Sequence, residues 1–201
     1  MDRKRLDQQF DFIKEIDKFI QRQTRLSDNV RRENDAEHAW HMAIMTVLLS
    51  EYANEKIDVL RTVTMLLIHD IVEIDAGDTY AYDEEGLKTQ RERECQAADR
   101  IYALLPEDQQ SKLRDIWEEF EAGETPEAKF AHTMDNLQPA MLNVVNNGVS
   151  WKEHGIAISQ IMKRNAHTAE GSQVLWDYAY ENFFKKNIDD GNIIDDSDKE
   201  N

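Results

Sequence analysis

The chain has 201 residues, 40% of them hydrophobic, with one cysteine and a formal net charge of −17. That length supports one hydrophobic core, and the lone Cys95 excludes an internal disulfide framework and favours a reducing cytoplasm. The acidic balance argues against polymeric nucleic acid as a partner, because such binding needs Lys and Arg to neutralise phosphates. No uninterrupted apolar run reaches about 18 residues, so we expect no membrane association through a spanning helix.

Helical spacing of apolar residues recurs along the chain, and alternating strand patterns are absent. Asn34 or Asp35, Asp58 and Thr125 are suitable N-caps for three of the expected helices. We treat the polar segment 23–34 as a loop with a turn at Ser27-Asp28-Asn29. The expected helices cover about residues 5–22, 34–53, 58–77, 87–105, 106–122, 125–142, 156–163 and 167–185.

The helical pattern predicts a single all-α domain over residues 1–187. Residues 188–201 are acidic and poor in packing residues, so we expect a disordered tail there. No internal repeat or linker divides the chain further. The apolar surface of the first and late helices is sufficient to support a homodimer.

His69 and Asp70 stand side by side near the end of the apolar run from Thr64 to Val72. A buried carboxylate is costly unless a positive charge compensates it, and a divalent cation would satisfy both residues. Glu73 follows one turn later on the same face. That position suits a general base that takes a proton from a water molecule.

Two more polar residues lie at apolar positions of other helices. His38 lies one turn inside the second helix, and Asp135 lies in the apolar stripe of the helix that begins at Thr125. Each alone is compatible with an ordinary core residue that has a hydrogen-bond partner. Together with the His69-Asp70 dyad they form a set of two imidazoles and two carboxylates on three helices.

This pattern resembles that of the HD-domain metal-dependent phosphohydrolases, and more narrowly the HD-domain 5′-deoxynucleotidases and their bacterial relatives. The matching segments are Arg32-Glu33-Asn34, Ala36-Glu37-His38, Leu67-Ile68-His69-Asp70, Ile71 to Asp78, Trp117-Glu118-Glu119-Phe120, Phe130 and Asp135. The resemblance covers about residues 13–178. It implies a single HD-domain helical bundle with the metal site between helices.

The resemblance also implies roles for individual residues. His38, His69, Asp70 and Asp135 would hold one divalent metal ion, and Glu73 and Asp78 would be catalytic. An arginine at the end of the first helix would bind the substrate phosphate; Arg22 is the nearest match and Arg25 the alternative.

Other residues leave alternatives open. Gln23 stands where the characterised nucleotidases have a tryptophan thought to disfavour ribose, so the sugar preference is open. His41 is either a fifth ligand or a group behind the site. Tyr80, Tyr82 and Trp40 either line a base pocket or belong to the core.

Two imidazoles and two carboxylates suit Mn²⁺, Co²⁺, Fe²⁺ or Zn²⁺, with Mg²⁺ less natural. Together with this donor set, the resemblance implies a cytoplasmic, metal-dependent 5′-nucleotidase that hydrolyses (deoxy)nucleoside 5′-monophosphates. The alternatives are a hydrolase of nucleoside triphosphates or signalling nucleotides, and a non-catalytic interaction protein stapled by a metal.

Overall fold

Helices dominate the computed structural model, which describes residues 2–197. The α-helices are α1 Arg3–Glu15, α2 Asp35–Leu49, α3 Val59–Ile68, α4 Glu73–Ala76, α5 Glu84–Tyr102, α6 Glu107–Ala122, α7 Pro126–Val145, α8 Val149–His154, α9 Ile158–Arg164, α10 Thr168–Gly171, α11 Gln173–Ala179 and α12 Lys186–Asp189. Short 3-10 turns cover Ile16–Lys18, Ser50–Tyr52 and His69–Val72, and a π-helical segment covers Tyr180–Lys185. None of the described helices is long and apolar enough to cross a membrane. The all-α fold class is confirmed.

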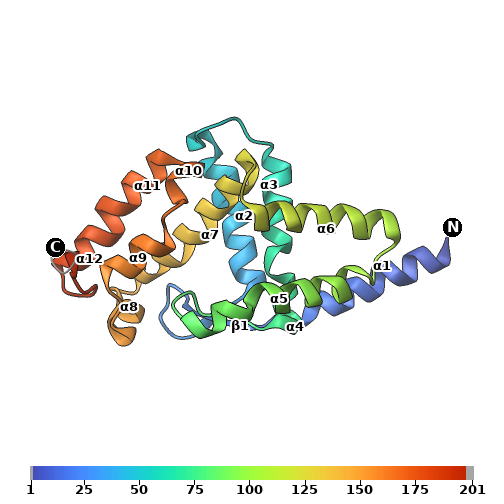
Figure 1. Cartoon of the computed structure of the whole chain (residues 1–201), viewed down its shortest axis with the longest axis horizontal. Coiled ribbons are helices and arrows are strands. Elements are labelled where there is room, and N and C mark those ends of the chain that lie inside the picture. The colour runs from blue at the N-terminus through green and yellow to red at the C-terminus, as the bar shows by residue number, and fades with distance from the viewer. Residues whose placement is uncertain (1, 198–201) are drawn as a thin grey trace.

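Helices α2, α3 and α7 form the centre of the molecule (Figure 1). Helices α1, α5 and α6 extend to one side of them, and α8 to α12 extend to the other. The core is continuous through this centre, where side chains of all three helices and of α6 are fully buried: Met42, Met65, Leu66, Trp117, Phe130 and Met134. The centre therefore supplies a rigid frame for any polar group placed within it.

Side-chain caps start the three central helices, as the sequence predicts. Asn34 and Glu37 form a capping box at α2. The Asp58 carboxylate accepts from the backbone N–H of Arg61 at α3, and the Thr125 hydroxyl accepts from that of Ala128 at α7. These caps fix where each helix begins, and so which side chains its inner face carries.

The segment before α2 differs from the expectation. The first helix ends at Glu15, and a hairpin of strands β1, Gln21–Arg25, and β2, Arg32–Asn34, replaces the end of the predicted helix and the predicted loop. The strands pair antiparallel around a turn in which Asn29 has a positive φ of 55°. Asp35 holds the entrance to the hairpin, because its carboxylate accepts from the backbone N–H of Ile20. Arg22 therefore lies on a strand and not at a helix end.

The last part of the chain packs more closely than a tail would. Ile193 is buried, and Ile194 forms a parallel bridge with Ala157 before α9. Residues 188–197, placed by the sequence in a disordered tail, thus continue the domain. Residues 198–201 lie outside the described part.

Candidate metal centre

Three side chains from separate elements converge in the core. His38 comes from α2, His69 from the 3-10 turn after α3, and Asp135 from α7. One imidazole nitrogen of each histidine and a carboxylate oxygen of Asp135 lie within 4.8 Å of one another. His38 is fully buried and His69 nearly so. These are three of the four predicted ligands, and their spacing fits a single cation.

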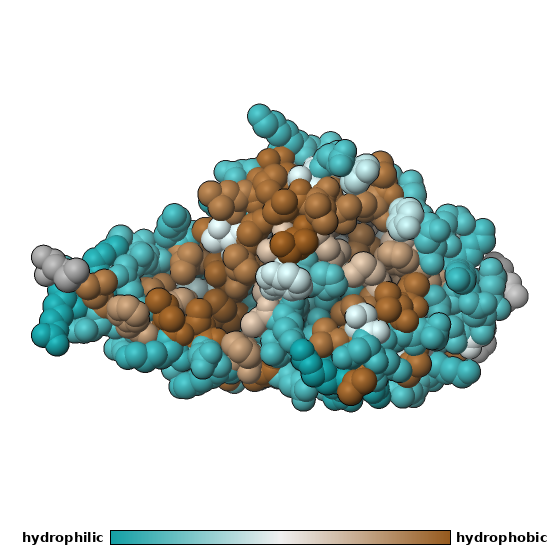
Figure 2. Space-filling view, turned by 180° about the vertical axis from the view of Figure 1, so that it is seen from behind, coloured by the Kyte–Doolittle hydropathy of each residue, from teal (hydrophilic) through white to brown (hydrophobic). Residues whose placement is uncertain are grey.

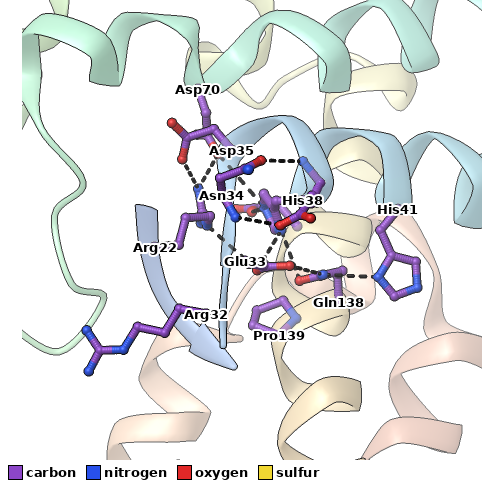
Figure 3. A network of polar contacts seen from close by, with 12 residues as sticks. Arg22, Arg32, Glu33, Asn34, Asp35, His38, His41, Asp70, Gln138 and Pro139 are labelled. Atoms are coloured by element: carbon purple, nitrogen blue, oxygen red, sulfur yellow. Dashed lines mark hydrogen bonds and ion pairs between the residues drawn. The ribbon is translucent and has the colours of Figure 1, made fainter. Parts of the chain in front are cut away.

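Hydrogen bonds behind the rings fix which imidazole nitrogen faces the cluster. The Nδ1–H of His69 donates to the carbonyl of Leu66 at 2.9 Å. In His38, Nδ1 lies 2.9 Å from Oε1 of Gln138. The amide of Gln138 is itself oriented, since its Nε2 donates to Glu33 at 2.8 Å and to His41 at 3.1 Å (Figure 3). In their neutral form, with the proton on Nδ1, both rings therefore present the Nε2 lone pair to the cluster.

Those lone pairs face carboxylate oxygens. Nε2 of His38 lies 3.1 Å from Oδ1 of Asp135, and Nε2 of His69 lies 3.0 Å from Oδ1 of Asp70. The latter contact lacks hydrogen-bond geometry, and Nε2 of His69 is a buried atom without a hydrogen-bond partner among the described residues. A lone pair against an anion is repulsive unless a proton or a cation lies between them. The donor set therefore fits a divalent metal ion.

The histidine pKa values report the same demand for positive charge. Burial and Arg22 lower the pKa of His38, but the carboxylates of Asp135 and Glu33 outweigh them and raise it to about 9. Burial opposes a positive charge on His69 too, yet Asp70 raises its pKa above the ordinary value. A metal ion would supply the charge that these rings otherwise obtain from protons.

Asp70 links this cluster to a second group of charges. It pairs with Nη1 of Arg22, and this nitrogen also lies 3.7 Å from Oε2 of Glu73 and 3.8 Å from Oδ1 of Asp35. Nε of Arg22 is buried and has no hydrogen-bond partner within residues 2–197. The other candidate, Arg25, lies 3.6 Å from Glu153 instead. Of the two predicted phosphate-binding arginines, the structure brings Arg22 into the cluster.

Glu73 and Asp78 complete the set of predicted residues. Glu73 is 6% exposed, and burial together with the charge of Asp70 raises the pKa of its carboxyl strongly. Burial also raises the pKa of Asp78, although the positive charge of Arg22 opposes that shift.

These residues open into a cavity of about 640 Å³. Arg22, Asp70, Glu73 and Asp78 are in its wall, as are apolar and aromatic side chains that include Tyr80, Tyr82, Trp151 and Phe184. A cavity of this size accommodates a small organic ligand, with polar groups to orient it and apolar ones to cover it. Of the two interpretations of the aromatic residues, Tyr80 and Tyr82 follow the first, because they line this cavity. Trp40 follows neither, because it is exposed on α2.

The sequence did not single out several residues of this site. Gln138 orients His38 through a hydrogen bond. Its amide nitrogen also contacts His41, so Gln138 lies between His41 and His38, and His41 is not among the ligand atoms. Asp35, whose pKa burial raises to about 6, joins Asp70 and Glu73 in a second group of carboxylates within 4.8 Å. Gln138 follows Asp135 by three positions in an apolar stripe, which is the signal that could have found it. Arg32, in contrast, points away from the cluster (Figure 3).

Comparison with known proteins places this geometry in a family. The model of the HD domain family matches residues 15–176. A crystal structure of a predicted metal-dependent phosphohydrolase from Magnetospirillum magnetotacticum MS-1 is similar over 94% of this chain and 96% of that one, with 45% identity and a TM-score of 0.89.

Curated relatives match a shorter part. The 5′-deoxynucleotidase HDDC2 of Homo sapiens is 32% identical over 111 residues, which are 55% of this chain and 53% of the relative. The 5′-deoxynucleotidase hdd1 of Schizosaccharomyces pombe is 26% identical over 110 residues, 53% of this chain and 54% of that one. The chain thus spans about half the length of the curated relatives it matches.

Proposed function

This chain belongs to the HD domain family, and we propose that it is a metal-dependent phosphohydrolase that converts (deoxy)nucleoside 5′-monophosphates to nucleoside and phosphate. One observation carries the proposal: two buried imidazoles, each with Nδ1 held by an acceptor, direct Nε2 at carboxylates beside a cavity. The names of the similar proteins, a metal-dependent phosphohydrolase and 5′-deoxynucleotidases, support the reaction type.

In this proposal His38, His69, Asp70 and Asp135 hold one divalent ion. Imidazole and carboxylate together suit Mn²⁺, Co²⁺, Fe²⁺ or Zn²⁺ better than Mg²⁺. When bound, the ion supplies Lewis-acid chemistry, polarising a phosphoryl oxygen and acidifying a water molecule. The fixed Nδ1 hydrogen bonds of both rings keep the ligand atoms in place before the ion arrives.

The other residues have distinct tasks. Glu73 accepts the proton of the attacking water, because burial and the charge of Asp70 raise the pKa of its carboxyl and so make it a stronger base. Arg22 exchanges its contact with Asp70 for the substrate phosphate, whose oxygens its planar guanidinium matches. Asp78 faces the leaving 5′-oxygen, and Tyr80 and Tyr82 cover the nucleoside from the wall of the cavity.

A substrate panel tests the proposal. Nucleoside and deoxynucleoside mono-, di- and triphosphates are incubated with the metal-free protein and each of Mn²⁺, Co²⁺, Zn²⁺ and Mg²⁺, and phosphate and pyrophosphate are assayed separately. We expect phosphate from the 5′-monophosphates. Asp70→Ala should abolish it, whereas Asp75→Ala, which removes an exposed partner of Arg100, should not. Pyrophosphate from triphosphates would assign the site to another substrate class, and no turnover with any metal would leave a metal-stapled interaction protein.

We also propose that the enzyme is a cytoplasmic homodimer that associates through an apolar face of α1, α2 and α3. Figure 2 shows apolar side chains gathered over the centre of one side of the molecule. The exposed large hydrophobic residues on α1, α2 and α3 are Phe10, Ile13, Trp40, Ile44, Val47, Leu48, Leu60 and Leu67. Helix α2 carries no acidic or basic residue other than His41 from Ala39 to Leu49, so two strongly acidic chains can meet there without like-charge contact.

Two valines provide a matched test of this face. Val47 on α2 and Val174 on α11 are 59% and 57% exposed. Val47→Glu should convert the dimer to a monomer in sedimentation equilibrium, because it places a charge inside the interface, and Val174→Glu should leave it intact. A monomeric wild-type protein, or a dimer unaffected by Val47→Glu, would contradict the proposed interface.

A further inference from the structure

Arg164, at the C-terminal end of α9, contacts the proposed metal ligand Asp135 through a different oxygen from the one that faces the histidines. Its NH2 group lies 3.4 Å from Oδ2 of Asp135. The other oxygen, Oδ1, lies 3.1 Å from Nε2 of His38 and 3.9 Å from Nε2 of His69. The two oxygens of Asp135 therefore have different partners, one toward the metal cluster and the other toward a guanidinium.

The start of α9 is fixed by the last described residues of the chain. The backbone N–H of Ile158 donates to the carbonyl of Ile194 at 2.9 Å. Asp196 accepts from both the backbone N–H and the hydroxyl of Ser159, at 3.1 Å and 2.6 Å. These contacts hold the N-terminal turn of the seven-residue helix that carries Arg164.

The chain after Arg164 is fixed to α7 on both sides of Asp135. The hydroxyl of Thr133 donates to the carbonyl of Thr168 at 2.8 Å, and the side-chain amide of Asn136 donates to the hydroxyl of Thr168 at 3.1 Å. Helix α10 approaches α7 so closely that a Cβ on Gly171 would lie 2.3 Å from the carbonyl oxygen of Lys129. Arg164 thus reaches Asp135 from a rigid support.

We propose that Arg164 is a positioning residue that keeps Oδ2 of Asp135 occupied, so that this carboxylate offers one oxygen, Oδ1, to the metal. A carboxylate can bind a cation through one oxygen or through both, and an arginine held against one of them selects the first mode. The inference rests on the proposed metal site, and it concerns how that site is shaped rather than which substrate it takes.

Metal binding to the metal-free protein tests the inference without any assay of turnover. We compare wild type with Arg164→Gln by the visible absorption spectrum of bound Co²⁺ and by titration with Mn²⁺. In Arg164→Gln the freed oxygen becomes available as a ligand and a nearby positive charge is lost. We expect a changed Co²⁺ spectrum and Mn²⁺ binding that is tighter by roughly 3- to 10-fold, because the repulsion between the guanidinium and the cation is removed. Arg164→Lys retains the charge and should stay close to wild type.

Arg61 is the matched control, because its side chain is 42% exposed against 39% for Arg164 and it also pairs with one carboxylate, Glu119. Arg61→Gln should leave the Co²⁺ spectrum and the Mn²⁺ affinity unchanged. Thermal denaturation of each metal-free variant identifies any that fails to fold, and the Lys variant then carries the comparison.

Several outcomes would overturn the inference. An unchanged Co²⁺ spectrum in Arg164→Gln would do so whatever the affinity, as would weaker Mn²⁺ binding or a Lys variant that behaves like the Gln variant. Inorganic phosphate serves as a second probe: a loss of phosphate inhibition with an unchanged Co²⁺ spectrum would make Arg164 a direct phosphate contact instead. If wild type binds no metal at all, the proposed function fails. If wild type and Arg164→Gln bind metal with the same Co²⁺ spectrum and the same Mn²⁺ affinity, only this inference fails.

Discussion

Two charged regions of the molecule differ in how their charges are satisfied. Between α5 and α6, Arg91 and Arg114 pair with Glu118 at 2.7 Å and 2.9 Å, and both guanidinium groups lie over the ring of Trp117. In the metal centre, buried atoms of Arg22, His69 and Glu73 have no hydrogen-bond partner among the described residues. The first region satisfies its charges within the fold, whereas the second leaves groups that a ligand would satisfy.

Trp117 joins the two regions physically. Its ring lies under the arginines, and its Nε1–H donates to the carbonyl of His69 at 3.2 Å. The satisfied region therefore supports the backbone at the histidine of the unsatisfied one. Substitutions in the metal centre should affect ligand binding and turnover, and substitutions around Trp117 should affect the free energy of unfolding.

Glu73→Gln should produce the largest effect. The amide cannot accept the proton of the attacking water, so kcat should fall roughly 100- to 10,000-fold. Burial and Asp70 raise the pKa of Glu73, so a neutral amide suits the empty site and the metal-free variant should be at least as stable as wild type. Steady-state kinetics and thermal denaturation measure the two effects.

Glu118→Gln is the control from the other region, since its side chain is 41% exposed and pairs with two arginines. Its kcat should remain within about twofold of wild type, because surface ion pairs contribute little. A Glu73→Gln enzyme that retains more than a tenth of wild-type kcat would remove Glu73 from the role of general base.

Gln138→Met should have the next largest effect, because it removes the acceptor for Nδ1 of His38 and the donor to Glu33. Loss of such a support typically costs about 10- to 100-fold in metal affinity or activity. Calorimetric titration of Mn²⁺ into the metal-free protein measures it. Gln109→Met, which breaks a half-buried amide pair between α6 and α1, should leave Mn²⁺ affinity unchanged, and equal affinities in both variants would contradict the role of Gln138.

The sequence could predict the helices and most of the side chains that the structure brings together in the candidate metal centre. The caps at Asn34, Asp58 and Thr125 act locally, so their position in the chain is enough to locate the central helices. His38 and Asp135 are polar residues on apolar faces, and such residues require a partner wherever the helices meet. Their convergence with His69 is the outcome that this requirement implies.

Other features depend on contacts that no local pattern records. The strand Gln21–Arg25 is polar throughout, so it lacks the alternation that marks a strand, and its pairing with β2 is what gives it that form. Arg164 meets Asp135 because of how α9 and α10 pack on α7. Residues 190–197 of the acidic segment after α12 are ordered, although their composition predicts disorder, because Ile193 is buried against the domain.

Arg114→Gln should have the smallest effect. It removes ion pairs with Glu118 and Asp99 and one of the two guanidinium groups over Trp117. Exposed ion pairs contribute at most about 1 kcal/mol and a stacked cation about 0.5–1 kcal/mol, and Arg91 still covers the ring. Urea denaturation should show a loss of about 1 kcal/mol that shrinks in high salt, with kcat unchanged. A fall in kcat would mean that the hydrogen bond from Trp117 to His69 transmits the loss, and the two regions would then have to be treated as one cooperative unit.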